Sequence, residues 1–160
     1  QSVARQSEQT LNATSVSDTA VFDIKTSSHV WGMFWGAKNI SLAGMHSNYT
    51  TDVNSLNGVD PIASSQLLYE NQTRFALGSD YFSMTSGWYF APQCPERTGY
   101  HAYFWTLQAW SRDPMGSVGF GKLINVALEQ TVSQEAVDAS GHGVGGVLYR
   151  EISKETQNEI

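Results

Sequence analysis

Ten of the nineteen aromatic residues of this chain (five Trp, seven Tyr and seven Phe) fall within thirty consecutive positions, residues 81–110. Each ring carries about 150–250 Å² of surface that needs a core or an interface to cover it. Residues 100–110 are the clearest strand of the run, and both of their alternating faces are largely apolar. A strand that faces solvent on one side shows one polar face. We therefore expect this strand to be covered twice, by an opposing sheet and by a second layer.

The second layer is either a neighbouring subunit or a loop of the same chain folded over the sheet. We favour the subunit, which makes the chain a homo-oligomer. The candidate interface residues are Tyr100, Tyr103, Trp105 and Leu107.

Strand patterns continue on both sides of this run, separated by turn signals rich in Gly, Pro and Asn. They cover residues 20–26, 29–35, 67–77, 81–91, 122–132 and 147–152, with a shorter pattern at 40–42. A short helix is compatible with residues 130–139. About 7–10 short strands with little helix predict an all-β fold, a single antiparallel β-sandwich of the jelly-roll type.

A length of 160 residues suits one domain. We expect a polar N-terminal arm at 1–19, the β-sandwich domain at 20–152 and a polar C-terminal tail at 153–160.

Charge argues against two classes of partner. The net charge is −6 and the nine Lys and Arg residues are scattered. Without a basic patch, neither a nucleic-acid backbone nor an anionic membrane surface is an expected direct partner. No apolar run approaches the ~20 residues of a membrane span.

Motifs for chemistry are missing from the sequence. The four histidines do not share metal-ligand spacing, the single cysteine, Cys94, cannot form an intrachain disulfide, and the glycine cluster at 141–146 lacks the Lys of a phosphate-binding loop. No serine-nucleophile elbow occurs. We expect no enzyme activity, no catalytic residue, no metal site and no cofactor, and sequence alone leaves paired carboxylates for glycoside hydrolysis open. His101, which opens the aromatic strand, would make assembly pH-sensitive if it lay in an interface.

Four Asn-x-Ser/Thr sequons are candidate glycosylation sites, at Asn12, Asn39, Asn48 and Asn71. Coincidence in a chain rich in Ser and Thr explains them equally well. Three tryptophans could act as platforms for a sugar ring, which leaves a glycan ligand open: Trp31, Trp35 and Trp88.

Residues 76–110 resemble the central motif of the jelly-roll family of complement globular heads and tumour-necrosis-factor-like cytokines. The resemblance is carried by the run Ser86-Gly87-Trp88-Tyr89-Phe90-Ala91-Pro92 and by Gly99-Tyr100, which opens the aromatic strand. The family implies a compact trimer, with Tyr103 or Trp105 near its threefold axis. Residues 93–98 lengthen the usual spacing, and the last third of the chain departs from the family pattern. Similar heads also occur in structural proteins of viruses, and a viral jelly roll of another lineage stays open.

Three functions compete. The first is a non-catalytic virion structural protein (capsid, spike or decoration protein) that assembles with itself, as a trimer by preference, or with other capsid subunits. The second is a secreted trimeric recognition head similar to the complement proteins. The third is a carbohydrate-binding β-sandwich. The expected location is accordingly the virion or the extracellular space.

Overall fold

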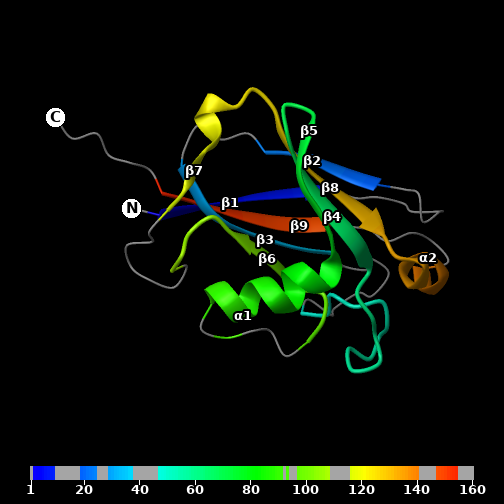
Figure 1. Ribbon diagram of the computed structural model, residues 1–160. Coiled ribbons are helices and arrows are strands. Elements are labelled where there is room, and N and C mark those ends of the chain that lie inside the picture. The colour runs from blue at the N-terminus through cyan, green and yellow to red at the C-terminus, as the bar shows by residue number, and fades with distance from the viewer. Residues whose placement is uncertain are drawn as a thin grey trace.

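The computed structural model describes residues 2–9, 19–24, 29–37, 47–91, 93, 97–108, 116–140 and 147–154. They form two antiparallel sheets that face each other, with the interior of the domain between them (Figure 1). The predicted all-β sandwich is therefore confirmed.

The first sheet has the strand order β1-β9-β3-β6, and a short strand, β7, also pairs with β3. Its strands are β1 (Ser2–Gln9), β3 (His29–Ala37), β6 (His101–Phe104), β7 (Val118–Gly119) and β9 (Val147–Lys154). The second sheet has the order β2-β8-β4-β5. Its strands are β2 (Thr19–Asp23), β4 (Ile62–Tyr69), β5 (Gln72–Gly78) and β8 (Val126–Val132).

The pairing is that of a long hairpin rolled up on itself. Apart from β7, the first strand pairs with the last, β2 with β8, β3 with β6 and β4 with β5, and these pairs alternate between the two sheets. This is the topology of a jelly roll, in which two sheets hide most strand edges inside one sandwich.

Alternation along the strands builds the core. In β8 every second residue is buried, and in β2 the burial pattern is strictly alternating as well. Met33 and Leu128 are fully buried from opposite sheets. Close packing of such side chains supplies most of the stability of a domain of this size.

A helical segment replaces the strand predicted at 81–91, so that prediction is wrong. It consists of a π-helical turn, η1 (Tyr81–Thr85), and α1 (Ser86–Phe90). The segment links β5 to β6, which are edge strands of the two sheets, and it closes this side of the sandwich (Figure 1). Phe82 is its anchor, because this ring is 1% exposed and lies 5.0 Å from the ring of Trp35 and 5.4 Å from that of Phe75.

Other boundaries differ from the sequence prediction. Strand β6 ends at Phe104, well short of residue 110, because the chain bends after this point. Strand β1 lies within the expected arm and β9 extends to Lys154, so both are sheet strands instead of terminal extensions there. The division of the chain into arm, sandwich and tail otherwise stays a prediction, and the strand expected at 40–42 lies outside the described residues.

The remaining helices are short. The 3-10 turn η2 (Phe120–Lys122) follows β7, and α2 (Gln134–Ser140) follows β8 close to the helix expected at 130–139. Among the described residues, no helix has the length and apolar character needed to cross a membrane.

Candidate functional site

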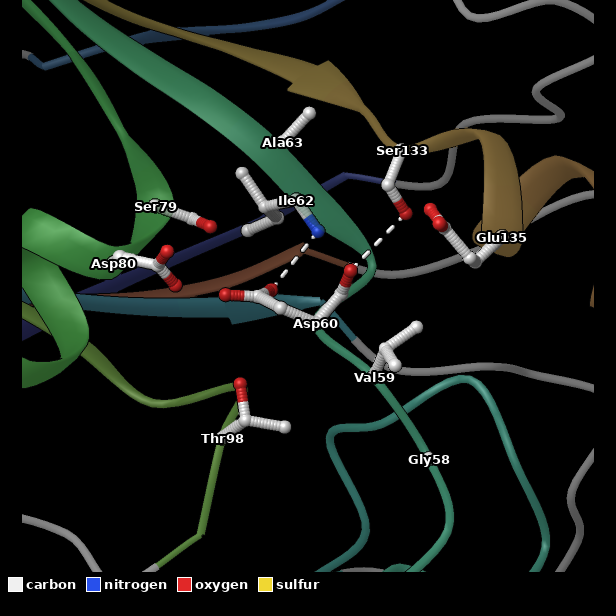
Figure 2. A pocket seen from close by; sticks show the side chains of 10 residues that line it. All are labelled: Gly58, Val59, Asp60, Ile62, Ala63, Ser79, Asp80, Thr98, Ser133 and Glu135. Atoms are coloured by element: carbon white, nitrogen blue, oxygen red, sulfur yellow. Dashed lines mark hydrogen bonds between the residues drawn. The ribbon is translucent and has the colours of Figure 1, made fainter.

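A cavity of about 480 Å³ opens at one end of the sandwich, where β4 begins, β5 ends and β8 leads into α2 (Figure 2). Its lining is Gly58, Val59, Asp60, Ile62, Ala63, Ser79, Asp80, Thr98, Ser133 and Glu135. Three of these residues are acids and none is basic, so the cavity is electronegative. No group of three or more His, Cys, Asp or Glu side chains within the described part of the chain is placed to hold a metal ion.

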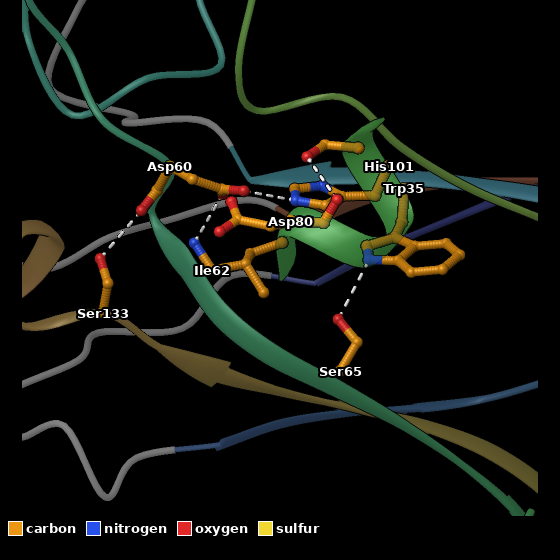
Figure 3. Close-up of polar contacts among 8 residues, drawn as sticks. Trp35, Asp60, Ile62, Ser65, Asp80, His101 and Ser133 are labelled. Atoms are coloured by element: carbon orange, nitrogen blue, oxygen red, sulfur yellow. Dashed lines mark hydrogen bonds and ion pairs between the residues drawn. The ribbon is translucent and has the colours of Figure 1, made fainter. Parts of the chain in front are cut away.

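Asp60 forms an ion pair with His101 at the inner end of this cavity. The distance from Nε2 of His101 to Oδ2 of Asp60 is 2.5 Å, and the two side chains are 0% and 11% exposed (Figure 3). The imidazole ring lies nearly parallel to the indole of Trp35, with ring centres 5.9 Å apart. His101 therefore lies in the interior of its own domain, whereas pH-sensitive assembly would need it at a subunit interface.

The same aspartate ties three chain segments together. Its Oδ1 accepts a hydrogen bond from the Ile62 amide at 2.9 Å, and its carbonyl oxygen accepts one from the Ser133 hydroxyl at 3.0 Å (Figure 3). The Ser133 amide in turn donates to the carbonyl of Pro61 at 2.9 Å. These contacts connect the start of β4, the start of β6 and the end of β8, so Asp60 positions the end of the sandwich and has a structural role.

Polar contacts also cross the interior between the sheets. The indole Nε1 of Trp35, on β3, donates to the hydroxyl of Ser65, on β4, over 3.2 Å (Figure 3). Gln130 pairs with Ser65 in the sheet register and is 2% exposed, and its amide has no hydrogen-bond partner among the described residues. The core is thus partly polar around Trp35.

The four candidate interface residues fall into two pairs. Tyr103 and Trp105 are partly buried and pack against the core, with the Tyr103 ring 4.5 Å from that of Phe75 and the Trp105 ring 5.4 Å from that of Phe120. Tyr100 is 36% exposed and Leu107 is 74% exposed. Only these last two present much surface to a neighbour, and their role in an interface stays a prediction.

Burial also changes the acidity of two core tyrosines. Loss of solvent raises the pKa of the Tyr103 hydroxyl above its usual 10.0, the nearby Tyr81 raises it further and Arg74 opposes the rise. Burial likewise raises the pKa of the Tyr69 hydroxyl, and the interaction with the Trp105 side chain opposes this rise. Both side chains are therefore neutral throughout the physiological range.

A loop supplies part of the second layer that the aromatic strand required. The ring of Tyr49 lies 5.0 Å from that of Tyr100, and the Tyr100 hydroxyl donates to the Ser47 carbonyl at 2.8 Å. Gly99 has a positive φ of 97°, and a Cβ there would clash with the Tyr49 carbonyl oxygen. The alternative of a loop folded over the sheet thus holds at Tyr100.

The two described sequons differ in their surroundings. The Asn48 side chain is 8% exposed, and its Nδ2 donates to the carbonyls of Asp52 at 2.7 Å and Val53 at 3.2 Å. A glycan on that nitrogen would remove at least one of these bonds, and glycosylation at Asn48 stays a prediction. Asn71 is exposed at the turn between β4 and β5, with φ of 64°. Asn12 and Asn39 lie outside the described residues.

Sequence reasoning missed an exposed surface on the helical segment 81–90. Its outward side chains are Met84, Thr85, Trp88 and Tyr89, which we call the helix face. The available signal was the separation of Met84 and Trp88 by one helical turn in a stretch without charge. Residue types that favour strands concealed that signal.

Comparison with known proteins gives a consistent result. The family model described as large eukaryotic DNA virus major capsid protein matches residues 1–156. The major capsid protein of Invertebrate iridescent virus 3 is 41% identical over 138 residues, which cover 78% of this chain and 30% of that protein. The one from Lymphocystis disease virus 1 is 37% identical over 147 residues, or 83% of this chain and 32% of that protein.

A solved structure shares the fold. The capsid model of the virus PBCV-1 superposes with a TM-score of 0.76 and 14% identity, covering 95% of this chain and 46% of that one. The chain spans about 30% of the length of the curated relatives that it matches. The resemblance to complement heads and tumour-necrosis-factor-like cytokines is wrong, because the matching family is viral and because Ser86–Phe90, which carried much of it, is helical.

Proposed function

We propose, from the premise that this chain belongs to the major capsid protein family of large eukaryotic DNA viruses, that it is part of the subunit that builds the virus shell. The observation that carries the proposal is the family match over residues 1–156, which includes every strand of the jelly roll. Family membership agrees with the first function predicted from sequence and with a location in the virion. It leaves no support for a secreted recognition head.

The proposed role is structural and non-catalytic. The cavity suits this role, because the oxygens of Asp60 already have structural partners. Its carboxylate contacts His101 and the Ile62 amide, and its carbonyl oxygen accepts from Ser133. A jelly roll with such internal ties is a rigid unit from which a shell can be built. Neither nucleic acid nor a membrane is proposed as a direct partner, because the net charge is −6.

The proposed partners are other capsid subunits, including copies of the same protein. We propose three copies for the first assembly unit, as a closed symmetric ring of one of the kinds that soluble homo-oligomers form. Trp35 is 3% exposed and belongs to the core, so it is no platform for a sugar ring, whereas Trp88 is 78% exposed and a carbohydrate ligand there stays a prediction.

Mass spectrometry of purified virus particles tests this function. Tryptic peptides from this chain are expected among the most abundant of the particle, as befits a shell subunit present in many copies. Native mass spectrometry of subunits released from the particles is expected to give three copies. Particles that lack these peptides would contradict the capsid role, and released monomers or dimers would contradict the trimer alone.

A further inference from the structure

Three large side chains of the helical segment 81–90 point outward, where they are exposed to water in the isolated domain. The side turned inward carries small residues in addition to the Phe82 anchor, namely Ser83, Ser86 and Gly87. The outward side carries Met84, Trp88 and Tyr89, which are 62%, 78% and 74% exposed. A surface helix normally shows the opposite arrangement, with its apolar stripe toward the core.

Charge distribution separates this helix from the rest of the surface. No charged residue occurs from Tyr81 to Pro95, although the whole chain carries a net charge of −6. Two copies of an acidic protein repel each other wherever their charges meet. Two copies therefore approach each other at the lowest electrostatic cost through an uncharged surface. Such a surface can face a copy of itself without bringing like charges together.

Location makes this surface accessible to a neighbour. The helix lies on the outside of the domain beside β6, where it closes the side of the sandwich (Figure 1). Its inner side is fixed by Phe82, whose ring contacts Trp35, Phe75 and Tyr103. The outer side chains are thus presented from a rigid support, which lowers the entropy lost on binding.

The area available fits a weak contact that many copies repeat. From the exposed fractions of Met84, Trp88 and Tyr89, the patch offers about 450 Å² per copy. Two copies would bury about 900 Å², which is below the standard size of a stable complex and typical of weak association. In a shell such contacts act together, and their combined strength far exceeds that of one contact.

We propose that the helix face, formed by Met84, Thr85, Trp88 and Tyr89, is a contact surface between copies of this chain. The occupant is a second copy, because the surface is uncharged, is large enough for a weak contact and belongs to a protein whose proposed function is to assemble with itself. The inference rests on that proposed function and adds the surface through which assembly proceeds.

Sedimentation velocity of the purified chain, from micromolar to near-millimolar concentration, provides the test. The wild-type chain is expected to self-associate reversibly toward the top of this range. The double variant Trp88→Ser/Tyr89→Ser is expected to raise the dissociation constant at least about 30-fold, as loss of central aromatic anchors does at other interfaces. The single variant Thr85→Glu is expected to raise it by a similar factor, because it brings like charges together across the contact. Matched controls are Ile124→Ser and Leu56→Ser, which remove side chains that are 85% and 77% exposed elsewhere, and Thr85→Gln, which adds no charge.

Folding is monitored in parallel by circular dichroism, and if the double variant unfolds, the exposed single change Thr85→Glu decides the outcome. A second measurement is independent of affinity: Met84→Cys in a Cys94→Ser background is expected to cross-link to itself with a short bis-maleimide. Unchanged association in Thr85→Glu, or equal losses in the Ile124→Ser control, would overturn the helix face. A wild-type chain that self-associates through another surface refutes this inference alone, whereas absence of the chain from virus particles refutes the capsid function.

Discussion

Replacing Asp60 with alanine tests whether this residue holds the end of the sandwich together. The change removes the acceptor of the Ile62 amide and the partner of His101, while the carbonyl that accepts from Ser133 remains. Each buried polar group left without a partner costs about 1–3 kcal/mol. We therefore expect a loss of about 3 kcal/mol in the free energy of unfolding.

For a chain of this length, that loss corresponds to a fall of about 10 °C in the melting temperature. Thermal unfolding followed by circular dichroism at neutral pH measures it. Asp60→Asn is expected to lose less, because its amide oxygen still accepts from the Ile62 amide while the ion pair with His101 is lost. Intermediate stability of this variant separates the two contacts.

Asp80→Ala is the matched control, since Asp80 lines the same cavity but is exposed. Exposed substitutions of this kind change stability by about 0.5 kcal/mol or less. If Asp60→Ala melts within a degree or two of Asp80→Ala, the ties seen at Asp60 contribute nothing, and the structural role assigned to this residue is wrong.

Three further changes probe the anchor of the helix, the covering loop and the buried tyrosines. Phe82→Ala is expected to cost about 3–5 kcal/mol in urea unfolding, because it removes a fully buried ring, whereas loss of under 1 kcal/mol would show that the helix is not anchored there. Gly99→Ala, at φ of 97° with the Tyr49 carbonyl in the way, is expected to lower the melting temperature much more than Gly78→Ala, where nothing lies within 4 Å; equal effects would refute the close approach. Because the folded pKa of Tyr103 is raised above 10.0, the folded state holds its proton longer than the unfolded state does, and stability is full below pH 10.0 and falls as the pH rises beyond it. Tyr103→Phe is expected to reduce this alkaline loss in pH-dependent unfolding, and an unchanged profile would contradict the raised pKa.

Local alternation is what made the fold class predictable. In β2 and β8 the period-two pattern follows directly from the two faces of each strand, one of which meets the core. The turn between β4 and β5 fits the same logic, since Glu70 and Asn71 both adopt positive φ in a tight hairpin. Both features depend on neighbours in sequence; sequence reasoning reached the alternation, whereas it gave residues 67–77 as one strand pattern and did not place the turn.

The helical segment was misread because its residue types and its structure disagree. Trp88, Tyr89 and Phe90 favour strands, and Gly87 is a poor helix former. A helix this short is marginal without packing. It forms because Phe82 is fixed between the sheets, and that contact involves Trp35, Phe75 and Tyr103 from three strands or their ends.

The Asp60 to His101 pair also lay beyond sequence reasoning, since its partners are 41 positions apart. Likewise the polar strand β1 has no apolar pattern of its own. Its pairing with β9 joins the two ends of the chain, with Ser2 opposite Lys154. Long-range pairing of backbone groups places such a strand in a sheet whatever its side chains are, and only the topology reveals it.

The rolled-up topology separates the demands of folding from those of assembly. The strands pair across the whole length of the chain, so their inward residues are constrained from both sheets at once. The connection from β5 to β6 crosses between the sheets, and it is held there by the fully buried Phe82 and by the partly buried Tyr81. Its outward side chains are exposed, so a contact with a neighbouring copy would leave the packing of the core unchanged. A connecting helix held on its inner side is therefore the part of this jelly roll best suited to carry a contact between copies.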